Sequence, residues 1–299
     1  MKASAPTIHQ ARRKFVLLML APATILLLGL TIVPFLVSFY LSFTNYTLSA
    51  PDSTKFVWLS NYTKLFTSSD FWKAFRVTVI FTVAAVGIET LLGLVIAVLL
   101  HYETRAIAAL RVLYLLPMAI TPVAATFTFR LMFNPTLGVF NYFLEQVGLP
   151  TQAWLADPKL ALPSLLLVDA WQWTPFIMLI IAGGLTSFPI EPFEAAKIDG
   201  ANWWQTFRYL TLPMLRPFLA VAILFRAIDA FKTFDIIFVL TGGGPGTETR
   251  TLNLLAFKQG IEFLKIGPAA SIAILMLITI IIATRLFLRY TGPVGQPQD

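Results

Sequence analysis

The sequence predicts an all-α integral membrane protein with six transmembrane helices. Of its 299 residues, 57% are hydrophobic and only 12% are charged, about half the charged share of a typical soluble domain. Six apolar stretches are long enough to cross a bilayer, which takes about 20 helical residues. A helix also satisfies its own backbone hydrogen bonds in lipid. Lipid is therefore the expected solvent for most of the chain.

Polar or proline-containing connections separate the predicted spans. These run over Phe15–Phe43, Ala74–Leu100, Leu110–Phe133, Leu162–Leu185, Met214–Leu240 and Pro268–Leu288. The first follows a basic cluster, as in a signal peptide, but it is longer than the apolar core of such a peptide and is interpreted as a retained span. We therefore expect a tail over residues 1–14, a transmembrane domain over residues 15–290 and a second tail over residues 291–299.

The basic residues predict that both tails are cytoplasmic, because Lys and Arg concentrate in cytoplasmic connections. Those that support this orientation are Arg12, Arg13, Lys14, Arg105, Arg111, Lys197, Arg208, Arg216, Arg285 and Arg289. The net charge of +7 is interpreted as a sign of membrane orientation and of contact with anionic lipid rather than of nucleic-acid binding.

With no cysteine and two histidines outside ligand spacing, no metal site is expected. The outer connections are expected to form short interfacial helices.

The connection between the fourth and fifth predicted spans has the pattern of a short exposed helix. It reads EPFEAAKIDGANWWQTFRYLTLP from Glu191 to Pro213. Pro192 and the acidic Glu191 and Glu194 favour a helix start. Gly200 then permits a tight turn or close packing. Aromatic residues follow as an apolar anchor before the next span.

This pattern resembles the cytoplasmic signature of the permease subunits of ATP-binding-cassette (ABC) importers: Glu-Ala-Ala, three residues, Gly, nine residues, Ile, one residue, Leu-Pro. Leu210 stands where that signature has Ile. The resemblance implies that residues 186–213 form a coupling loop seated in a cleft of an ATPase. The implied coupling residues are Glu194, Ala195, Ala196, Asp199, Gly200, Leu212 and Pro213.

Weaker motifs resemble the carbohydrate branch of these permeases, of the maltose, trehalose and glycerol-phosphate type. They include Leu59-Ser60-Asn61-Tyr62, Trp173-Thr174-Pro175-Phe176 and the glycine-rich Leu240–Gly246. The resemblance implies the type I (MetI-like) permease fold in a prokaryotic cell membrane. It also implies a second homologous permease, two ATPase subunits and an extracytoplasmic sugar-binding protein.

The chain itself is not expected to be an enzyme. No segment fits the phosphate-binding pattern G-x-x-x-x-G-K-[ST], and the glycine cluster Gly242–Gly246 lacks its Lys and Ser or Thr. ATP and Mg²⁺ are therefore expected on the partner ATPase, with no cofactor in this chain. Two other classes of membrane protein predict different sequence features. An ion-coupled carrier would show an inverted repeat and broken helices, and an intramembrane enzyme would show catalytic spacing; the sequence reveals neither.

Polar residues in the fifth predicted span suggest the substrate site. Ionisable groups inside a span cost about 2.5–3.5 kcal/mol each and mark pathway or packing roles. Arg226, Asp229, Lys232 and Thr233 share one helical stripe, while Asp235 is expected to point elsewhere. We expect this stripe either to bind sugar hydroxyls or to form internal ion pairs. In maltose-type permeases this helix contacts substrate, which implies contacts at Arg226 and from Asp229 through Ala230 to Thr233.

Aromatic residues of the fourth span offer a platform for a sugar ring, or else they lie at the membrane interface. The candidates are Trp173 and Phe176, with Gln172 as a hydrogen-bonding neighbour. Glu89 and Arg130 are expected as buried charges in an inter-helix pair or a partner contact. Because two acids balance Arg226 and Lys232, a neutral di- or oligosaccharide is favoured, and the sugar itself stays open.

Overall fold

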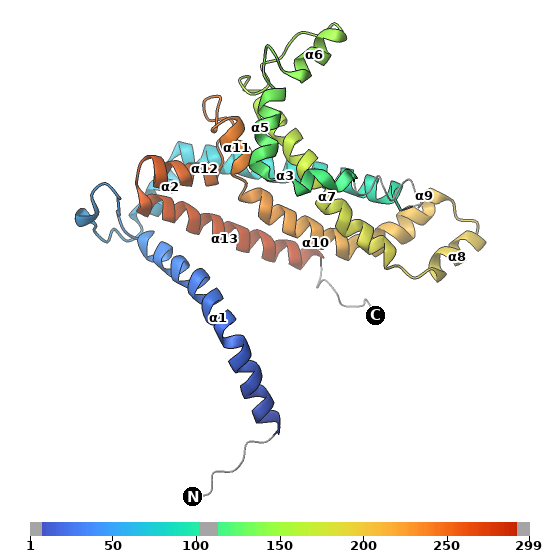
Figure 1. Cartoon of the computed structure of the whole chain (residues 1–299), viewed down its shortest axis with the longest axis horizontal. Coiled ribbons are helices and arrows are strands. Elements are labelled where there is room, and N and C mark those ends of the chain that lie inside the picture. The colour runs from blue at the N-terminus through green and yellow to red at the C-terminus, as the bar shows by residue number, and fades with distance from the viewer. Residues whose placement is uncertain (1–7, 102–112, 292–299) are drawn as a thin grey trace, which may run out of the picture. The chain divides into compact units, whose positions relative to one another are not determined.

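The structure is a computed structural model that describes residues 8–101 and 113–291 (Figure 1). Regular structure in these residues is helical, with one isolated β-bridge between Thr44 and Phe56. The helices are α1 (Ile8–Leu41), α2 (Ser60–Thr67), α3 (Ser69–Leu99), α5 (Pro122–Met132), α6 (Val139–Gln146), α7 (Ala161–Thr186), α8 (Glu191–Ile198), α9 (Trp203–Thr206), α10 (Leu212–Phe231), α11 (Asp235–Leu240), α12 (Leu252–Phe257) and α13 (Ile266–Thr291). The predicted all-α class is confirmed.

Five helical segments are long and apolar enough to cross a membrane by themselves. They are Phe15–Leu41, α3, α7, Trp203–Phe231 and α13. A sixth candidate consists of two shorter helices, Leu113–Ala119 and α5. Five of the six predicted spans are therefore present as continuous segments, although α3 begins at Ser69 instead of Ala74. Arg105 and Arg111 of the predicted second connection lie outside the described residues.

The third span is broken, which corrects the prediction of one span over Leu110–Phe133. Its two helices meet at an angle of 104°. The break falls before Pro122, which has no N–H to donate and begins α5. Thr121 is extended (φ −62°, ψ 136°), as the residue before a proline prefers. The broken helix that the sequence did not reveal is thus present.

The fifth span begins and ends earlier than predicted. Helix α10 ends at Phe231, and α11 begins at Asp235. Lys232 is the C-cap of α10, with φ −100° and ψ 10°. The prediction of one helix to Leu240 is therefore wrong. The polar stripe is divided between the last turn of α10 and the connection that follows it.

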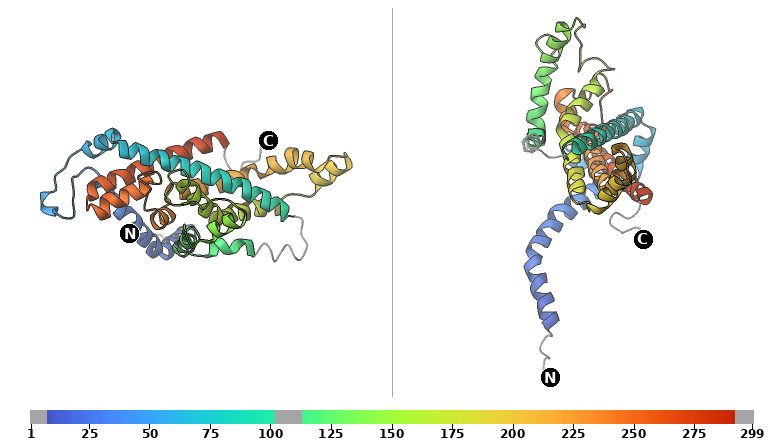
Figure 2. Two further views of the ribbon diagram at one scale, coloured as in Figure 1. Left: turned by 90° about the horizontal axis from the view of Figure 1, so that it is seen from above. Right: turned by 90° about the vertical axis from the view of Figure 1, so that its right-hand side faces the viewer.

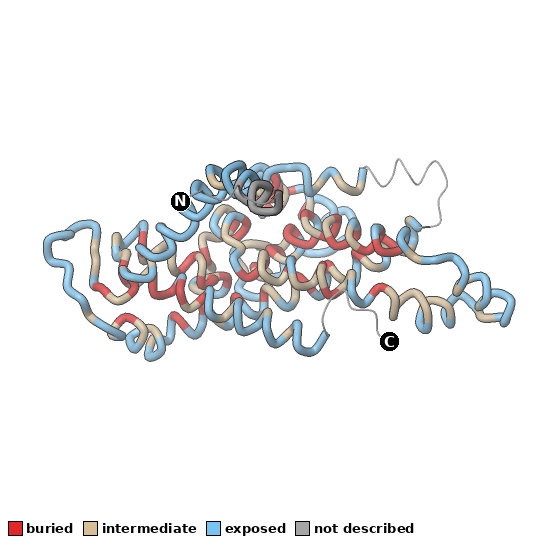
Figure 3. Tube along the Cα trace, turned by 90° about the horizontal axis from the view of Figure 1, so that it is seen from below, coloured by how far each residue is buried: buried red, intermediate tan, exposed pale blue. Residues whose placement is uncertain are grey.

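One compact unit contains Phe66–Phe257 and the residues from Leu275 onward. Within it, α3 packs along both α7 and α10, and the three helices lie side by side (Figures 1 and 2). Two apolar clusters of buried residues lie here. The one around Ile177 and Leu215 joins α3, α7 and α10, and the one around Phe81 and Leu165 joins α3 and α7 to α5, α11 and α12. Figure 3 shows these buried positions as red segments on the long helices. This core fixes the positions of the polar side chains described below.

The other unit contains the chain up to Leu65 together with Lys258–Ile274. Asn61 ties its loop together, since its Nδ2 donates to the carbonyl oxygens of Ser42 (2.9 Å) and Thr44 (2.8 Å). Backbone bonds from Leu48 to Leu264 (2.8 Å) and from Gly267 to Tyr46 (2.9 Å) join its two segments. The described side chains of α1 from Phe15 onward are mostly exposed. The expected short helix in the first outer connection is confirmed as α2.

Close packing of α3 on α7 predicts that Gly93→Ala destabilises the fold. A Cβ at Gly93 would lie 2.9 Å from Cγ2 of Ile177 and 3.0 Å from the backbone nitrogen of Met178. We expect a loss of about 1–3 kcal/mol, measured as a lower midpoint of thermal unfolding in detergent. Gly87→Ala on the same helix is the matched control, because its Cβ would meet nothing within 4 Å. Equal midpoints for the two variants would contradict this packing.

Candidate functional site: an exposed loop helix and a buried charge cluster

The predicted coupling segment forms α8, which ends in a glycine turn. Glu191 and Glu194 lie in its first turn, where the helix dipole favours negative charge. At its end, Ala201 donates its N–H to the carbonyl of Ala196 (2.9 Å), the bond of a Schellman motif. Gly200 has φ +77°, and a Cβ there would meet nothing within 4 Å. Of the two roles left open for this glycine, the turn is the one that the chain's own structure requires.

Beyond this turn, the chain runs without interruption into α10. Asn202 and Gln205 form a reciprocal capping box at the start of α9, with bonds of 2.8 and 2.9 Å. A π-helical turn over Phe207–Thr211 then joins α9 to α10. Trp203–Phe231 is therefore one continuous helical segment of 29 residues. Leu212 and Pro213 lie in its interior, at the first turn of α10.

Helix α8 has no buried residue: Pro192, Phe193 and Ala196 are half-buried, and its other residues are exposed. The most exposed large apolar side chain of α8 is that of Ile198, at 86% exposure. Next to α8 lies a cavity of about 580 Å³ with mostly apolar walls. Its aromatic lining residues are Phe188, Phe193, Trp203 and Phe207. An exposed helix beside an apolar hollow can seat against another protein. Figure 1 places α8 at the opposite end of α7 and α10 from α11.

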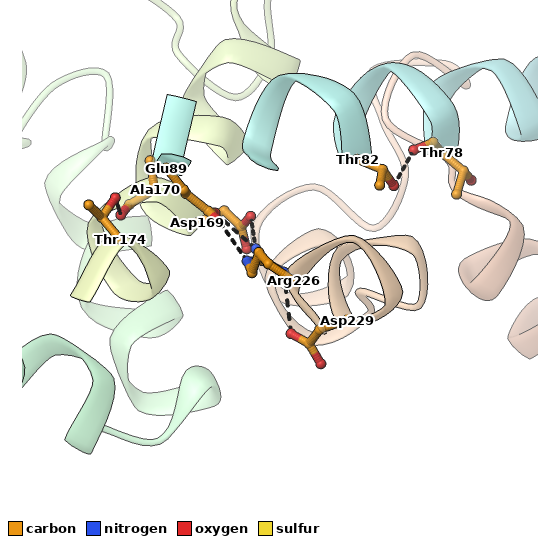
Figure 4. Close-up of polar contacts among 8 residues, drawn as sticks. All are labelled: Thr78, Thr82, Glu89, Asp169, Ala170, Thr174, Arg226 and Asp229. Carbon is orange, nitrogen blue, oxygen red and sulfur yellow. Dashed lines mark hydrogen bonds and ion pairs between the residues drawn. The ribbon is translucent and has the colours of Figure 1, made fainter. Parts of the chain in front are cut away.

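A buried charge cluster joins the three central helices (Figure 4). Arg226 on α10 is only 1% exposed. It grips Glu89 of α3 with two bonds, from Nε at 2.6 Å and from Nη2 at 3.0 Å. Nη2 also donates to Asp169 of α7, and Nη1 donates to Asp229 at 3.3 Å. The expected inter-helix pairing of Glu89 is therefore confirmed, and its partner is Arg226.

The cluster grades from a fully buried interior to a wetter edge. The side chains of Glu89 and Asp169 have no exposed surface, whereas that of Asp229 is 41% exposed. Lys232 approaches Asp229 at 3.6 Å from the exposed side. The Arg226 guanidinium also lies 5.3 Å from the ring centre of Trp173, within the range of a cation–π contact. Three carboxylates and an aromatic face thus surround one buried cation.

A cavity of about 280 Å³ opens at the wetter edge of this cluster. It is lined by Pro122, Asp169, Trp173, Asp229, Lys232, Thr233, Phe234, Asp235 and Ile236. The structure thus brings four predicted substrate residues together: Trp173, Asp229, Lys232 and Thr233. It also corrects the expectation for Asp235. Because α10 ends at Phe231, Asp235 lines this cavity rather than pointing elsewhere.

The remaining predicted substrate residues lie outside the lining of this cavity. Arg226 is behind it, engaged with Glu89 and Asp169, and Ala230 is buried at 2% exposure. Phe176 packs against the cluster around Ile177. Gln172 is buried and donates to the carbonyl of Ile120 at 3.1 Å, at the break in the third span. Broken membrane helices need such partners for the backbone groups that they free.

Two further residue predictions have structural outcomes. Arg130 is exposed, and its Nη1 donates to the carbonyl of Val239 at 3.0 Å, so the expectation of a buried charge is wrong. Within the glycine-rich loop, Gly242, Gly243 and Gly246 have positive φ. The Thr249 hydroxyl donates to the carbonyl of Gly244 at 2.6 Å. The loop therefore consists of tight turns.

A bundle of apolar helices with a polar cavity and an exposed loop helix is the arrangement expected of a membrane transport subunit. Residues 89–293 match the family described as "Binding-protein-dependent transport system inner membrane component". The chain belongs to this family. It is therefore a multi-pass inner membrane component, and as a permease subunit it is not catalytic. The matched region includes both the loop helix and the charge cluster.

Individual relatives agree with this assignment. The chain is 44% identical to a probable ABC transporter permease protein, y4oQ, of Sinorhizobium fredii, over 84% of this chain and 82% of that protein. It is 37% identical to the trehalose/maltose transport system permease protein MalF of Thermococcus litoralis, over 87% and 88%. The fold matches a bacterial alginate ABC transporter, solved in complex with an alginate pentasaccharide-bound periplasmic protein. The TM-score is 0.82 at 19% identity, over 94% of this chain and 95% of that chain.

These similarities identify a carbohydrate-type ABC importer permease with the type I (MetI-like) fold. The resemblance seen in the coupling signature is confirmed at the level of the family. Neither the ion-coupled carrier nor the intramembrane enzyme gains support from them. The weaker sugar-permease motifs had indicated the same branch.

The buried cluster predicts a large stability loss when its cation is removed. Arg226→Gln would leave Glu89 and Asp169 buried without their charged partner, which costs about 3–5 kcal/mol in comparable cases. We expect a lower unfolding midpoint in detergent and a lower yield of folded protein. Lys232→Gln is the matched control, since it breaks a half-exposed pair with Asp229 and should cost less than about 1 kcal/mol. Similar losses for both variants would show that burial does not set the strength of these pairs.

Proposed function

We propose that this chain forms half of the membrane pathway of an importer for a neutral di- or oligosaccharide, powered through α8 by a partner ATPase. The observation that carries the sugar part is the 280 Å³ cavity, which combines the Trp173 ring with carboxylate, ammonium and hydroxyl groups. Sugar rings present apolar faces to aromatic side chains and hydroxyls to such polar groups. A relative named for trehalose and maltose supports the same cargo class.

The cavity's size fits a shared site. Small-molecule pockets usually enclose about 300–1,000 Å³, and this cavity lies just below that range. A second, homologous permease would supply the other wall. The buried part of the cluster then serves packing, because Arg226 ties α3, α7 and α10 together, while Asp229 and Lys232 face the sugar. The two interpretations of the polar stripe thus apply to different parts of it.

The coupling part of the proposal rests on the exposure of α8 and its attachment to α10. Glu194, Ala195, Ala196, Asp199 and Gly200 would seat in the ATPase, while Leu212 and Pro213 begin α10, the helix that leads to the cavity. Movement of α8 would bias that span between two arrangements. ATP and Mg²⁺ would bind to the ATPase subunits, two per transporter.

The remaining parts of the assembly follow from the same function. An extracytoplasmic sugar-binding protein would deliver the cargo, by analogy with the alginate transporter crystallised with a periplasmic protein. Residues 186–213 would be cytoplasmic within the permease domain over residues 15–290. The tails over residues 1–14 and 291–299 would lie on the same side. Of these tails, residues 1–7 and 292–299 are outside the described structure.

The coupling proposal predicts that Gly200→Ala and Glu194→Lys lower sugar-stimulated ATP hydrolysis and uptake several-fold in the reconstituted transporter. A residue with a side chain at φ +77° costs about 1–2 kcal/mol, which would distort the turn after α8. Reversing the charge of Glu194 removes the favourable interaction at the start of the helix. Gly183→Ala on α7 is the control, since its Cβ would meet nothing within 4 Å and its φ is not positive. Wild-type hydrolysis and uptake in both loop variants would refute the coupling role.

The cavity proposal predicts that Trp173→Ala and Asp229→Ala lower uptake at least about tenfold while the transporter still assembles. Aromatic stacking and a charged hydrogen bond are each worth about 1–3 kcal/mol. Trp171→Ala is the matched control, because Trp171 lies on the same helix but outside this cavity. Uptake of labelled maltose and trehalose would be measured beside subunit composition by gel filtration. Loss of assembly in Asp229→Ala would instead assign that residue to packing.

A further inference from the structure

The cavity has an acidic lining. Three carboxylates contribute to it, from Asp169, Asp229 and Asp235, and Lys232 is the cation among its described lining residues. Arg226 does not change this balance at the surface of the cavity, because its guanidinium is buried and holds Glu89 and Asp169. Lys232 pairs with Asp229. Asp169 is in turn held by Arg226, so Asp235 is the carboxylate in the lining that has no cationic partner among the described residues.

Asp235 differs from the other two carboxylates. It is exposed, and it makes no ion pair with any residue in the part of the chain that the structure describes. Its position depends on the end of α10 at Phe231, which lets the chain turn before α11 begins. A bound solute would therefore meet the unneutralised charge of Asp235 directly.

Asp169 supplies an independent sign of what the cavity accepts. Its side chain is fully buried, and Oδ2 accepts a hydrogen bond from Arg226. Its other oxygen, Oδ1, accepts no hydrogen bond from any described residue. A buried acceptor without a donor is costly. This acceptor has almost no exposed surface, and at Asp169 the wall offers no hydrogen-bond donor to a solute oxyanion.

We infer that this cavity excludes anionic sugars and that Asp235 is the residue that determines the exclusion. The inference rests on the proposed function and narrows its substrate class to sugars that present hydroxyl or amine donors. Uronates, sulfonates and phosphates would be repelled. At about 10 Å and an effective dielectric constant near 20, one unit charge changes an equilibrium by about tenfold or more. The effect of a single charge substitution on the binding of an anionic sugar should therefore be measurable.

The test uses the purified complex of both permeases and the ATPases without the sugar-binding protein, so that only the membrane cavity discriminates. Labelled maltose is bound at equilibrium and displaced by maltitol or by maltobionate. These two competitors share an open-chain end and differ in charge. For wild type we expect maltobionate to compete much more weakly than maltitol. In Asp235→Lys this difference should shrink at least about tenfold, with Asp235→Asn between the two.

Glu145→Gln is the control for net charge, because Glu145 is an exposed acid on α6 outside the cavity lining. It should keep the wild-type ratio of the two competitors. If Trp173→Ala weakens maltose binding but Asp235→Lys keeps the wild-type ratio, the selectivity inference is overturned and the proposed function stands. If Trp173→Ala binds maltose as tightly as wild type, the cavity is not the sugar site and both fall.

Discussion

The interaction on which this structure depends is the grip of Arg226 on two carboxylates from other helices. A guanidinium and two carboxylates in a nearly water-free interior are stable only when they neutralise and hydrogen-bond one another. Glu89 and Asp169 come from α3 and α7, so the requirement also fixes how these helices sit against α10. Apolar packing is not directional, and by itself it would allow several registers between the three helices. The charge cluster specifies one of them, and it does so beside the cavity.

The same cluster explains how one set of polar residues supports two roles. Its interior members are fully buried and act on each other, while Asp229 is divided between Arg226 on one side and Lys232 and the cavity on the other. The Trp173 ring also faces both the guanidinium and the cavity. Groups that would contact a sugar are thus held from behind by groups that would not. Such support limits the motion of the contact atoms and preorganises the site.

Some of this architecture was predictable from the sequence because it depends on local chemistry. Apolar length predicted the spans, and the Gly200 turn followed from the freedom of glycine to adopt positive φ. Other features depend on distant partners. Glu89 and Arg226 are 137 positions apart, and nothing in either segment identifies the other. Proline was ambiguous in the same way. Pro175 and Pro217 lie inside continuous helices, whereas Pro122 follows a 104° break that the buried Gln172 amide supports. The end of α10 at Phe231, which brings Asp235 to the cavity, could not be predicted from the local sequence either.

The continuity of Trp203–Phe231 has a consequence for how such a transporter can diversify. At about 1.5 Å per residue, its 29 residues span roughly 40 Å, with the loop helix at one end and the cavity at the other. The residues of α8 that would meet the ATPase lie just before this segment, and the cavity residues Asp229, Lys232 and Asp235 lie at its other end or just after it. Substitutions in the last turn of α10 could change which solute is bound without changing the contact with the ATPase. One kind of ATPase interface could in this way serve permeases for many different solutes.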